Sequence, residues 1–121
     1  MRYVTVDEAK RRIEADGRVV VLDARASERY GQGRVPGAIN LPADAPDLAR
    51  RARDLVLDTQ ATILVYAENS RSPESRQVAR TMDAMGYRDV LLFDGGFSQW
   101  AGAGHPVEPS ETPEEPDAAR L

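Results

Sequence analysis

Three uninterrupted runs of apolar residues give this chain its clearest pattern. They cover residues 19–22, 62–67 and 90–93 and are rich in valine, isoleucine and leucine. Short continuous runs of this kind are typical of strands buried on both faces, as in a parallel sheet. Two smaller apolar pieces, Tyr3-Val4 and residues 38–41, predict brief additional strands, the second of which ends at Pro42.

Segments with helical spacing of apolar residues lie between these runs. Thr5 followed three residues later by Glu8 forms a capping box, which predicts the start of a first helix. Residues 44–57 and 75–85 carry apolar side chains three and four positions apart, so each predicts a longer helix. A helical turn is expected over residues 27–32, and a short helix over 97–101 that buries Trp100.

Strands therefore alternate with helices, which predicts an α/β fold with a mostly parallel sheet and helices on both faces. Ligands in such sheets bind beyond the carboxyl ends of the strands. Asp23, Arg25, Ala67 and Asp94 lie at the ends of predicted strands. We expect these four residues to gather near one surface.

The segment 108–121 differs in composition from the rest of the chain. It holds five acidic residues, one basic residue and three prolines, without apolar periodicity. This composition is typical of disordered chain. We therefore expect one domain over residues 1–107 and a disordered, acidic, proline-rich tail over 108–121 that carries the whole net charge of −4.

Composition also excludes several classes of function. The 121 residues include no cysteine and one histidine, which excludes disulfides, thiolate chemistry and the usual cysteine or histidine metal sites. We expect no metal and no cofactor. The neutral body has no basic surplus for nucleic acid, and no apolar run approaches the ~20 residues of a membrane span. Because the N-terminus has no signal-peptide core, we expect a cytoplasmic protein; we also expect a monomer.

The apolar run at 62–67 passes into a polar loop and then a helix. Unpaired backbone N–H groups and the macrodipole favour an anion at the start of a helix. We predict an anion-binding loop in which Arg71 and Arg76 add charge-assisted bonds and Ser75 is the helix N-cap. The loop comprises Ala67, Glu68, Asn69, Ser70, Arg71, Ser72, Pro73, Glu74, Ser75 and Arg76.

A second interpretation of the loop remains open: Glu68 and Glu74 offset both arginines, and the segment is simply solvated. Asp23 and Arg25 are expected to support the loop, with Asp23 accepting hydrogen bonds from loop amides and Arg25 pairing with it or a neighbour. A serine nucleophile is not expected, because the single histidine, His105, lies far along the chain.

Four segments, in order, resemble the motifs of rhodanese-like domains. Together they extend over roughly residues 3–107, and it is their combination that is specific. They are Val20-Val21-Leu22-Asp23-Ala24-Arg25 with Tyr30, then residues 33–42 (GRVPGAINLP), then Ile63-Leu64-Val65-Tyr66 with the loop, then Gly86-Tyr87 with residues 95–100 (GGFSQW).

The resemblance implies a three-layer α/β/α domain with a five-stranded parallel sheet. It also implies sulfur transfer by a cysteine after the fourth strand, which carries sulfur as a persulfide. The sequence departs from the family pattern at four places. Ala67 stands at the cysteine position, the step from Ala67 to Ser75 is eight residues and not six, Arg34 replaces a histidine, and Arg29 replaces a glutamate. We include Arg34 with Asp23 and Arg25 among the supporting residues.

The first departure decides the functional hypotheses, because the methyl group of Ala67 cannot act as a nucleophile in sulfur transfer or in the related phosphatases. The leading hypothesis is a catalytically inactive module that binds a small sulfate- or thiosulfate-like anion, or an unknown protein, for regulation. The alternative is a sulfurtransferase whose cysteine has been replaced, naturally or by engineering. A scaffolding domain without a ligand is the third.

Overall fold

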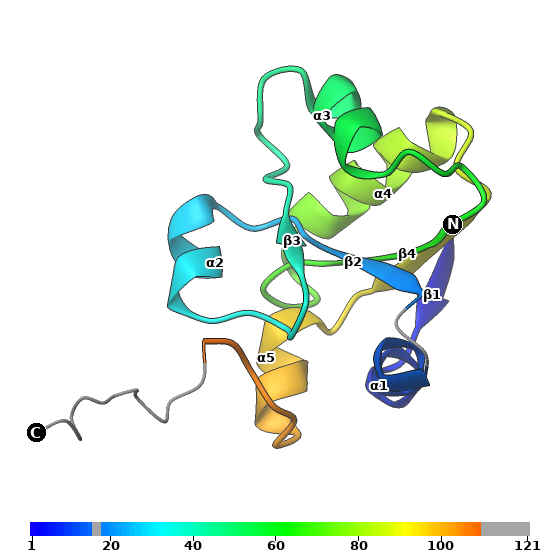
Figure 1. The fold of residues 1–121 in the computed structure, drawn as a ribbon. Coiled ribbons are helices and arrows are strands. Elements are labelled where there is room, and N and C mark those ends of the chain that lie inside the picture. The colour runs from blue at the N-terminus through cyan, green and yellow to red at the C-terminus, as the bar shows by residue number, and fades with distance from the viewer. Residues whose placement is uncertain (16–17, 110–121) are drawn as a thin grey trace, which may run out of the picture.

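The computed structural model describes residues 1–15 and 18–109, in which one twisted sheet lies between helices (Figure 1). All neighbouring strands in these ranges run parallel, in the order β1-β5-β4-β2-β3. The strands are β1 (Arg2–Val4), β2 (Val19–Asp23), β3 (Ile39–Asn40), β4 (Thr62–Tyr66) and β5 (Asp89–Phe93). The helices are α1 (Val6–Ala15), α2 (Ser27–Gln32), α3 (Leu48–Leu55), α4 (Glu74–Ala84) and α5 (Gly96–Gly102).

Alternate residues of the central strands enter two separate cores, which explains their continuously apolar sequences. In β4, Ile63 and Val65 belong to the core that includes residues of α3 and α4. Leu64 and Tyr66 belong to the opposite core, which includes residues of α1 and α5. Helices therefore cover both faces of the parallel sheet, and the predicted three-layer α/β/α architecture with five strands is confirmed.

The predicted elements agree closely with the structure except at α3. The amide of Glu8 donates to Thr5 Oγ1 at 3.2 Å, so the capping bond that we expected at the start of α1 is present. The expected helix over residues 44–57 forms only between Leu48 and Leu55. Asp47, which follows Pro46, has a φ of 57°, so a regular helix cannot continue through it from the N-terminal side.

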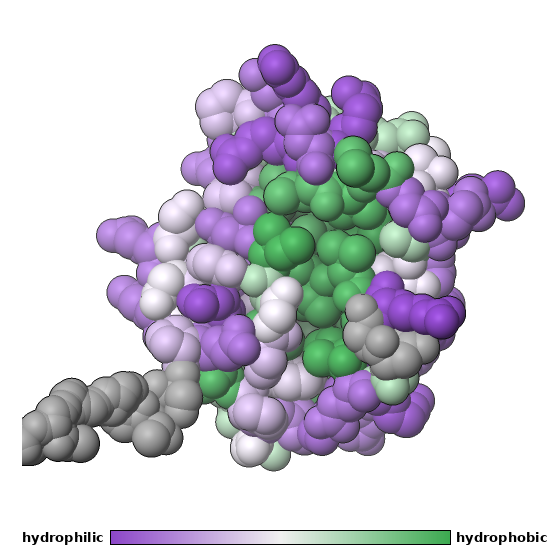
Figure 2. Space-filling model, viewed as in Figure 1, coloured by the Kyte–Doolittle hydropathy of each residue, from purple (hydrophilic) through white to green (hydrophobic). Residues whose placement is uncertain are grey.

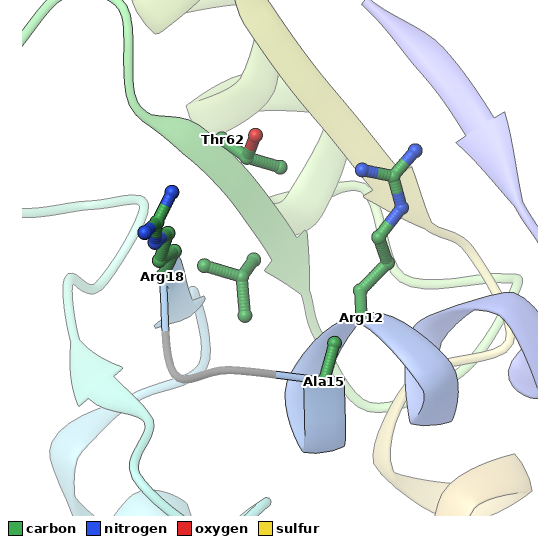
Figure 3. A pocket seen from close by; sticks show the side chains of 5 residues that line it. Arg12, Ala15, Arg18 and Thr62 are labelled. Carbon is green, nitrogen blue, oxygen red and sulfur yellow. The ribbon is translucent and has the colours of Figure 1, made fainter.

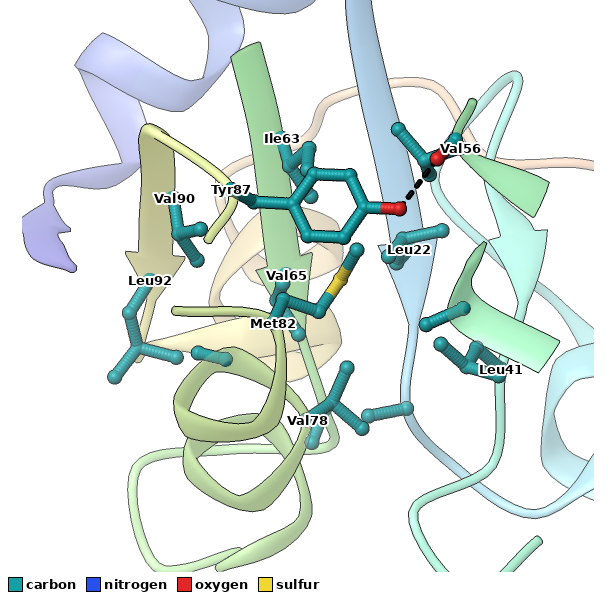
Figure 4. Packing of buried hydrophobic residues seen from close by; sticks show 14 residues of the cluster. Leu22, Leu41, Val56, Ile63, Val65, Val78, Met82, Tyr87, Val90 and Leu92 are labelled. Carbon is teal, nitrogen blue, oxygen red and sulfur yellow. Dashed lines mark hydrogen bonds between the residues drawn. The ribbon is translucent and has the colours of Figure 1, made fainter. Parts of the chain in front are cut away.

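The other end of α3 is fixed by a contact from the core. Val56 is extended, and its carbonyl oxygen accepts a hydrogen bond from the hydroxyl of Tyr87 (Figure 4). Leu57, which we expected in the helix, is 84% exposed. Figure 2 shows a continuous apolar area beneath α3 on the face turned toward the viewer.

The first residue of the expected tail, Glu108, is paired with the domain. Glu108, which we expected to begin the tail, forms an antiparallel bridge with Arg34 through N–H···O bonds of 2.6 and 2.8 Å. Paired backbone groups hold Glu108 against the domain. Residues 110–121 of the expected tail lie outside the described residues, so the prediction of disorder there is not tested. Within residues 1–15 and 18–109, no helix has the length and apolar character to span a membrane.

Candidate functional site

The loop after β4 is anchored at its root by the start of α5. Ala67 is buried, with 1% of its surface exposed. Its carbonyl oxygen accepts a hydrogen bond from the Phe97 amide at 2.8 Å, and that of Glu68 accepts one from the Ser98 amide at 2.9 Å. Gly96 makes this approach possible, because it has a φ of +68° and a Cβ there would lie 2.4 Å from the Ala67 oxygen.

Beneath the loop, a buried polar cluster joins the ends of β2 and β4. Asp23 is fully buried and accepts hydrogen bonds from the Arg25 amide at 2.9 Å and the Tyr66 hydroxyl at 2.6 Å. The guanidinium of Arg25, which is 4% exposed, lies 2.8 Å from Asp23 Oδ2. Burial, together with the Asp23 carboxylate, raises the pKa of Tyr66 far above its ordinary value, so its hydroxyl is a permanent donor. Arg25 thus pairs with Asp23 as we expected, and their supporting role for a binding site stays a prediction.

Glu68 extends this cluster to the surface. Its Oε1 lies 3.2 Å from Arg25 Nη1, and its Oε2 lies 3.0 Å from Arg29 Nη2. Partial burial alone would raise the pKa of Glu68, but hydrogen bonds from Arg29 and Arg25 outweigh it, and the net effect lowers this pKa. The carboxylate is thus held ionised by two guanidiniums, directly after the position where the family cysteine would stand.

Within the loop, several amides already have partners. The Arg71 amide donates to Asn69 Oδ1 at 2.9 Å, and the Ser72 amide donates to the Asn69 carbonyl oxygen at 3.0 Å. The Asn69 amide donates to Ser72 Oγ at 3.3 Å. These bonds close a tight turn, so the amides of Asn69, Arg71 and Ser72 are not available to an anion.

The start of α4 retains unpaired groups. Pro73 occupies the N-cap and the helix begins at Glu74, so Ser75 is not the N-cap that we predicted. Ser75 instead lies in the first turn, 1% exposed, and its hydroxyl has no hydrogen-bond partner among the described residues. The first bond of the helix runs from the Gln77 amide to the Pro73 carbonyl at 3.0 Å. The amides of the three preceding residues therefore have no intrahelical acceptor.

The three remaining arginines of the predicted site have different surroundings. Arg76 Nη1 pairs with Asp94 Oδ1 at 3.0 Å, whereas Arg71 makes no ion pair within the described ranges. The Cζ atom of Arg34 lies 4.6 Å from the Tyr30 ring centroid, and the Arg34 backbone pairs with Glu108. Arg25 contacts the loop through Glu68, whereas the ion pair and side-chain hydrogen bond of Arg34 within the described ranges go to Glu108 and Tyr30. The supporting role that we predicted for Arg34 stays a prediction.

The sequence analysis did not predict that Glu68 joins Arg25 to Arg29, nor that amides at the start of α5 bond to the loop backbone. The Gly95-Gly96 pair was a usable signal for the second, because glycine often marks a close backbone approach. No sequence pattern signals the ion pair between Glu68 and Arg29, because the two residues are 39 positions apart.

Hollows flank the loop, and a further one lies at the other end of the sheet. An open depression of about 520 Å³ is bordered by Asn69, Ser70, Asp94 and Ser98. The hollow in Figure 3 is bordered by Arg12, Arg18 and Thr62 at the amino ends of β2 and β4, away from the loop. It adjoins the last residue of α1, where the helix dipole disfavours anions, and Arg12 pairs with Glu8 at 3.3 Å. We therefore place the candidate site at the carboxyl ends of the strands.

Comparison with known proteins identifies relatives of this chain. The chain is 35% identical over 108 residues to the HTH-type transcriptional regulator Rv0324 of Mycobacterium tuberculosis, covering 87% of this chain and 44% of the regulator. It is 24% identical to the putative sulfur carrier protein YrkF of Bacillus subtilis, covering 82% of this chain and 50% of YrkF. The chain therefore spans about half the length of these two relatives. It is also 33% identical to the thiosulfate sulfurtransferase GlpE of Pseudomonas entomophila, covering 73% of this chain and 74% of GlpE.

Solved structures show the same fold. The crystal structure of the Alr3790 protein from Anabaena superposes with a TM-score of 0.77 at 25% identity, covering 89% of this chain and 81% of the other. A structure of rhodanese with anions from E. coli superposes with a TM-score of 0.61 at 31% identity, covering 74% and 95%. The family model for the rhodanese-like domain matches residues 5–103. The chain therefore belongs to the rhodanese-like domain family and, with Ala67 at the nucleophile position and no cysteine anywhere in its sequence, is a variant without the family's catalytic residue.

Proposed function

We propose that this chain is a rhodanese-like module without sulfurtransferase activity, which binds a sulfate- or thiosulfate-like oxyanion at the amino end of α4. The proposal rests on one observation: the site has an anchored loop and the amino end of a helix, but Ala67 stands at the nucleophile position. Sulfur transfer needs a thiolate to attack the sulfane sulfur and hold it as a persulfide. A methyl group offers neither a lone pair nor a proton to lose.

We propose that the anion occupies one end of the loop, at the start of α4. The amides of Glu74, Ser75 and Arg76 open the α4 helix and have no intrahelical acceptor, so they point at an anion placed on the helix axis. The buried hydroxyl of Ser75 adds a donor that has no partner in the described structure. Arg71 supplies a positive charge from the loop. A rhodanese structure described as containing anions, 31% identical to this chain, gives independent support.

Weak binding is expected. Glu74 lies in the first turn of α4 and repels an anion, and Asp94 already neutralises Arg76. A dissociation constant of about 1 mM or higher follows, equivalent to roughly −4 kcal/mol or weaker. Because the site is open to solvent, salt weakens this binding further.

The test is a titration of ¹⁵N-labelled protein with sodium sulfate, set against sodium chloride at matched ionic strength. Sulfate should shift the amides of Glu74, Ser75 and Arg76 most, and Arg71→Gln should weaken binding about fivefold, the upper range for an exposed charge pair. Arg80→Gln on the exposed side of α4 is the control and should change nothing. Equal shifts in chloride, or largest shifts elsewhere, would refute an oxyanion site.

A second function is a sulfurtransferase whose cysteine has been replaced, and the similarity to thiosulfate sulfurtransferase GlpE favours it. Ala67→Cys separates the two functions in a thiosulfate:cyanide assay. Strong activity would show that the rest of the site still supports sulfur transfer. A folded Ala67→Cys variant without activity would favour a site remodelled for binding. We propose the second outcome, because the amides of Asn69, Arg71 and Ser72 are engaged within the loop and cannot stabilise a thiolate at position 67.

A regulatory role is the cellular setting that we propose for such a module. The similarity to an HTH-type transcriptional regulator, of which the match covers 44%, supports this proposal. Binding of an anion or a protein at the loop would then report to neighbouring domains or partners. We propose a cytoplasmic location and a monomer for the isolated domain. Size-exclusion chromatography with light scattering tests the monomer.

A further inference from the structure

A separate hollow beside Glu68 combines positive charge with an apolar wall. Its volume is about 290 Å³, near the lower limit for pockets that hold small ligands. Arg25, Arg29 and Gln32 border it on the polar side, and Phe97, Ala101 and Val107 on the apolar side. The Cζ atom of Arg25 lies over the Phe97 ring, 4.4 Å from the ring centroid, and joins the two sides.

The two arginines differ in how firmly they are held. Arg25 is 4% exposed, and its guanidinium is engaged by Asp23, Glu68 and the Gly33 carbonyl. Arg29 is 51% exposed, and its Nε and Nη2 both face the Glu68 carboxylate, at 3.2 and 3.0 Å. This fork geometry is the one that guanidinium uses for any carboxylate. Exposed ion pairs are weak, so the bond from Arg29 to Glu68 is the part of the network that can exchange.

We propose that this hollow binds a carboxylate carried on a short apolar body, and that Glu68 is the internal carboxylate such a ligand displaces from Arg29. The ligand's carboxylate takes the fork of Arg29, beside the Gln32 side chain, and its apolar body lies against Phe97, Ala101 and Val107. Arg25 keeps Asp23 and so keeps its place. Glu68 therefore sets the affinity by competition.

A carboxylate with an apolar neighbour is preferred over an inorganic anion for two reasons. Arg29 offers planar, bidentate recognition, which matches a carboxylate. Among the described residues, the facing wall is formed by apolar side chains and gains from apolar contact. The same chemistry occurs in a free organic acid and at a peptide C-terminus, and the experiment compares both. This inference is independent of the oxyanion site, because the amides of α4 report on one and those of Gln32, Gly33 and Ala101 on the other.

The experiment is an NMR titration of the full chain with phenylacetate, acetate, phenylacetamide and acetyl-Gly-Gly-Phe. Phenylacetate should shift the Gln32, Gly33 and Ala101 amides and the Arg29 side-chain Nε–H. Acetate lacks the apolar body and phenylacetamide lacks the charge, so each should bind at least about fivefold more weakly. Tighter binding of the peptide assigns the site to a C-terminus, and tighter binding of phenylacetate assigns it to a free acid.

Two variants test the competition directly. Glu68→Gln keeps the size of the side chain but removes its charge, so it should tighten phenylacetate binding about fivefold. Arg29→Gln should weaken it by a similar factor, and Arg80→Gln, remote from the hollow, should leave it unchanged. Equal binding of phenylacetate and phenylacetamide would overturn the proposal. So would unchanged affinity in both Glu68→Gln and Arg29→Gln.

Discussion

Replacing Gly96 by alanine should destabilise the protein by about 2–5 kcal/mol. The φ of +68° costs a residue with a side chain about 1–2 kcal/mol. The new methyl carbon would also stand 2.4 Å from the Ala67 carbonyl oxygen and 2.9 Å from that of Glu68. Both are backbone atoms and cannot rotate away, so the two segments must separate, at a cost of about 1–3 kcal/mol typical of overpacking.

Urea unfolding measures this loss, and Gly31→Ala provides the matched control. A Cβ at Gly31 meets nothing within 4 Å, and Gly31 lies inside α2. Alanine there should be neutral or stabilising by up to about 1 kcal/mol. In Gly96→Ala, hydrogen exchange should also accelerate at the Phe97 and Ser98 amides, which hold the loop. A loss of less than about 1 kcal/mol in the free energy of unfolding, or unchanged exchange at both amides, would refute the claim that Gly96 allows α5 to approach and hold the loop.

Three further predictions concern the buried cluster, the surface carboxylate and the C-terminus. Tyr66→Phe should cost about 2–3 kcal/mol in urea unfolding, because it leaves the buried Val35 amide without its acceptor and removes one of the donors to the buried Asp23 carboxylate. A loss under about 0.5 kcal/mol would contradict this. The pKa of Glu68 is lower in the folded protein than in the unfolded chain, where it is near 4.5. Its ion pairs therefore stabilise the fold at pH values above about 4.5, and this contribution is lost as the pH falls through the lower, folded-state pKa. Wild type should therefore have a larger free energy of unfolding than Glu68→Gln at pH 7, and the difference should disappear in strong acid. A difference that increased in acid would contradict the lowered pKa of Glu68. Truncation after Pro109 should change the melting temperature by less than about 2 °C, because the removed segment has little apolar surface. Truncation after Val107 also removes the backbone hydrogen bonds of Glu108, so it should lower the melting temperature more than truncation after Pro109 does.

Much of the fold could be predicted because local patterns and tertiary burial agree. Residues 19–22 are apolar on both sides, and alternate side chains do enter opposite cores. The capping pair Thr5 and Glu8 fixes the start of α1 without tertiary help. Such segments can be assigned from a single sequence.

The site could be predicted only in part, because its decisive contacts join distant residues. The spacing of residues 44–57 favours a long helix, but the left-handed backbone at Asp47 overrides it. Ser75 is a residue type that often forms an N-cap, but Pro73 occupies the N-cap and the helix begins at Glu74. The link from Glu68 to Arg25 and Arg29 spans 43 and 39 positions and depends on how α2 packs beside the loop.

The most direct test of the central claim is one sample of wild-type protein with thiosulfate and cyanide, followed for both binding and turnover. Amide spectra report occupancy of the α4 terminus, and thiocyanate release reports sulfur transfer. We predict saturable shifts at Glu74, Ser75 and Arg76 in the millimolar range, with thiocyanate formed no faster than without protein. Thiocyanate formation proportional to the protein concentration and abolished by Gly96→Ala, or thiosulfate that leaves these amides unshifted, would contradict the account.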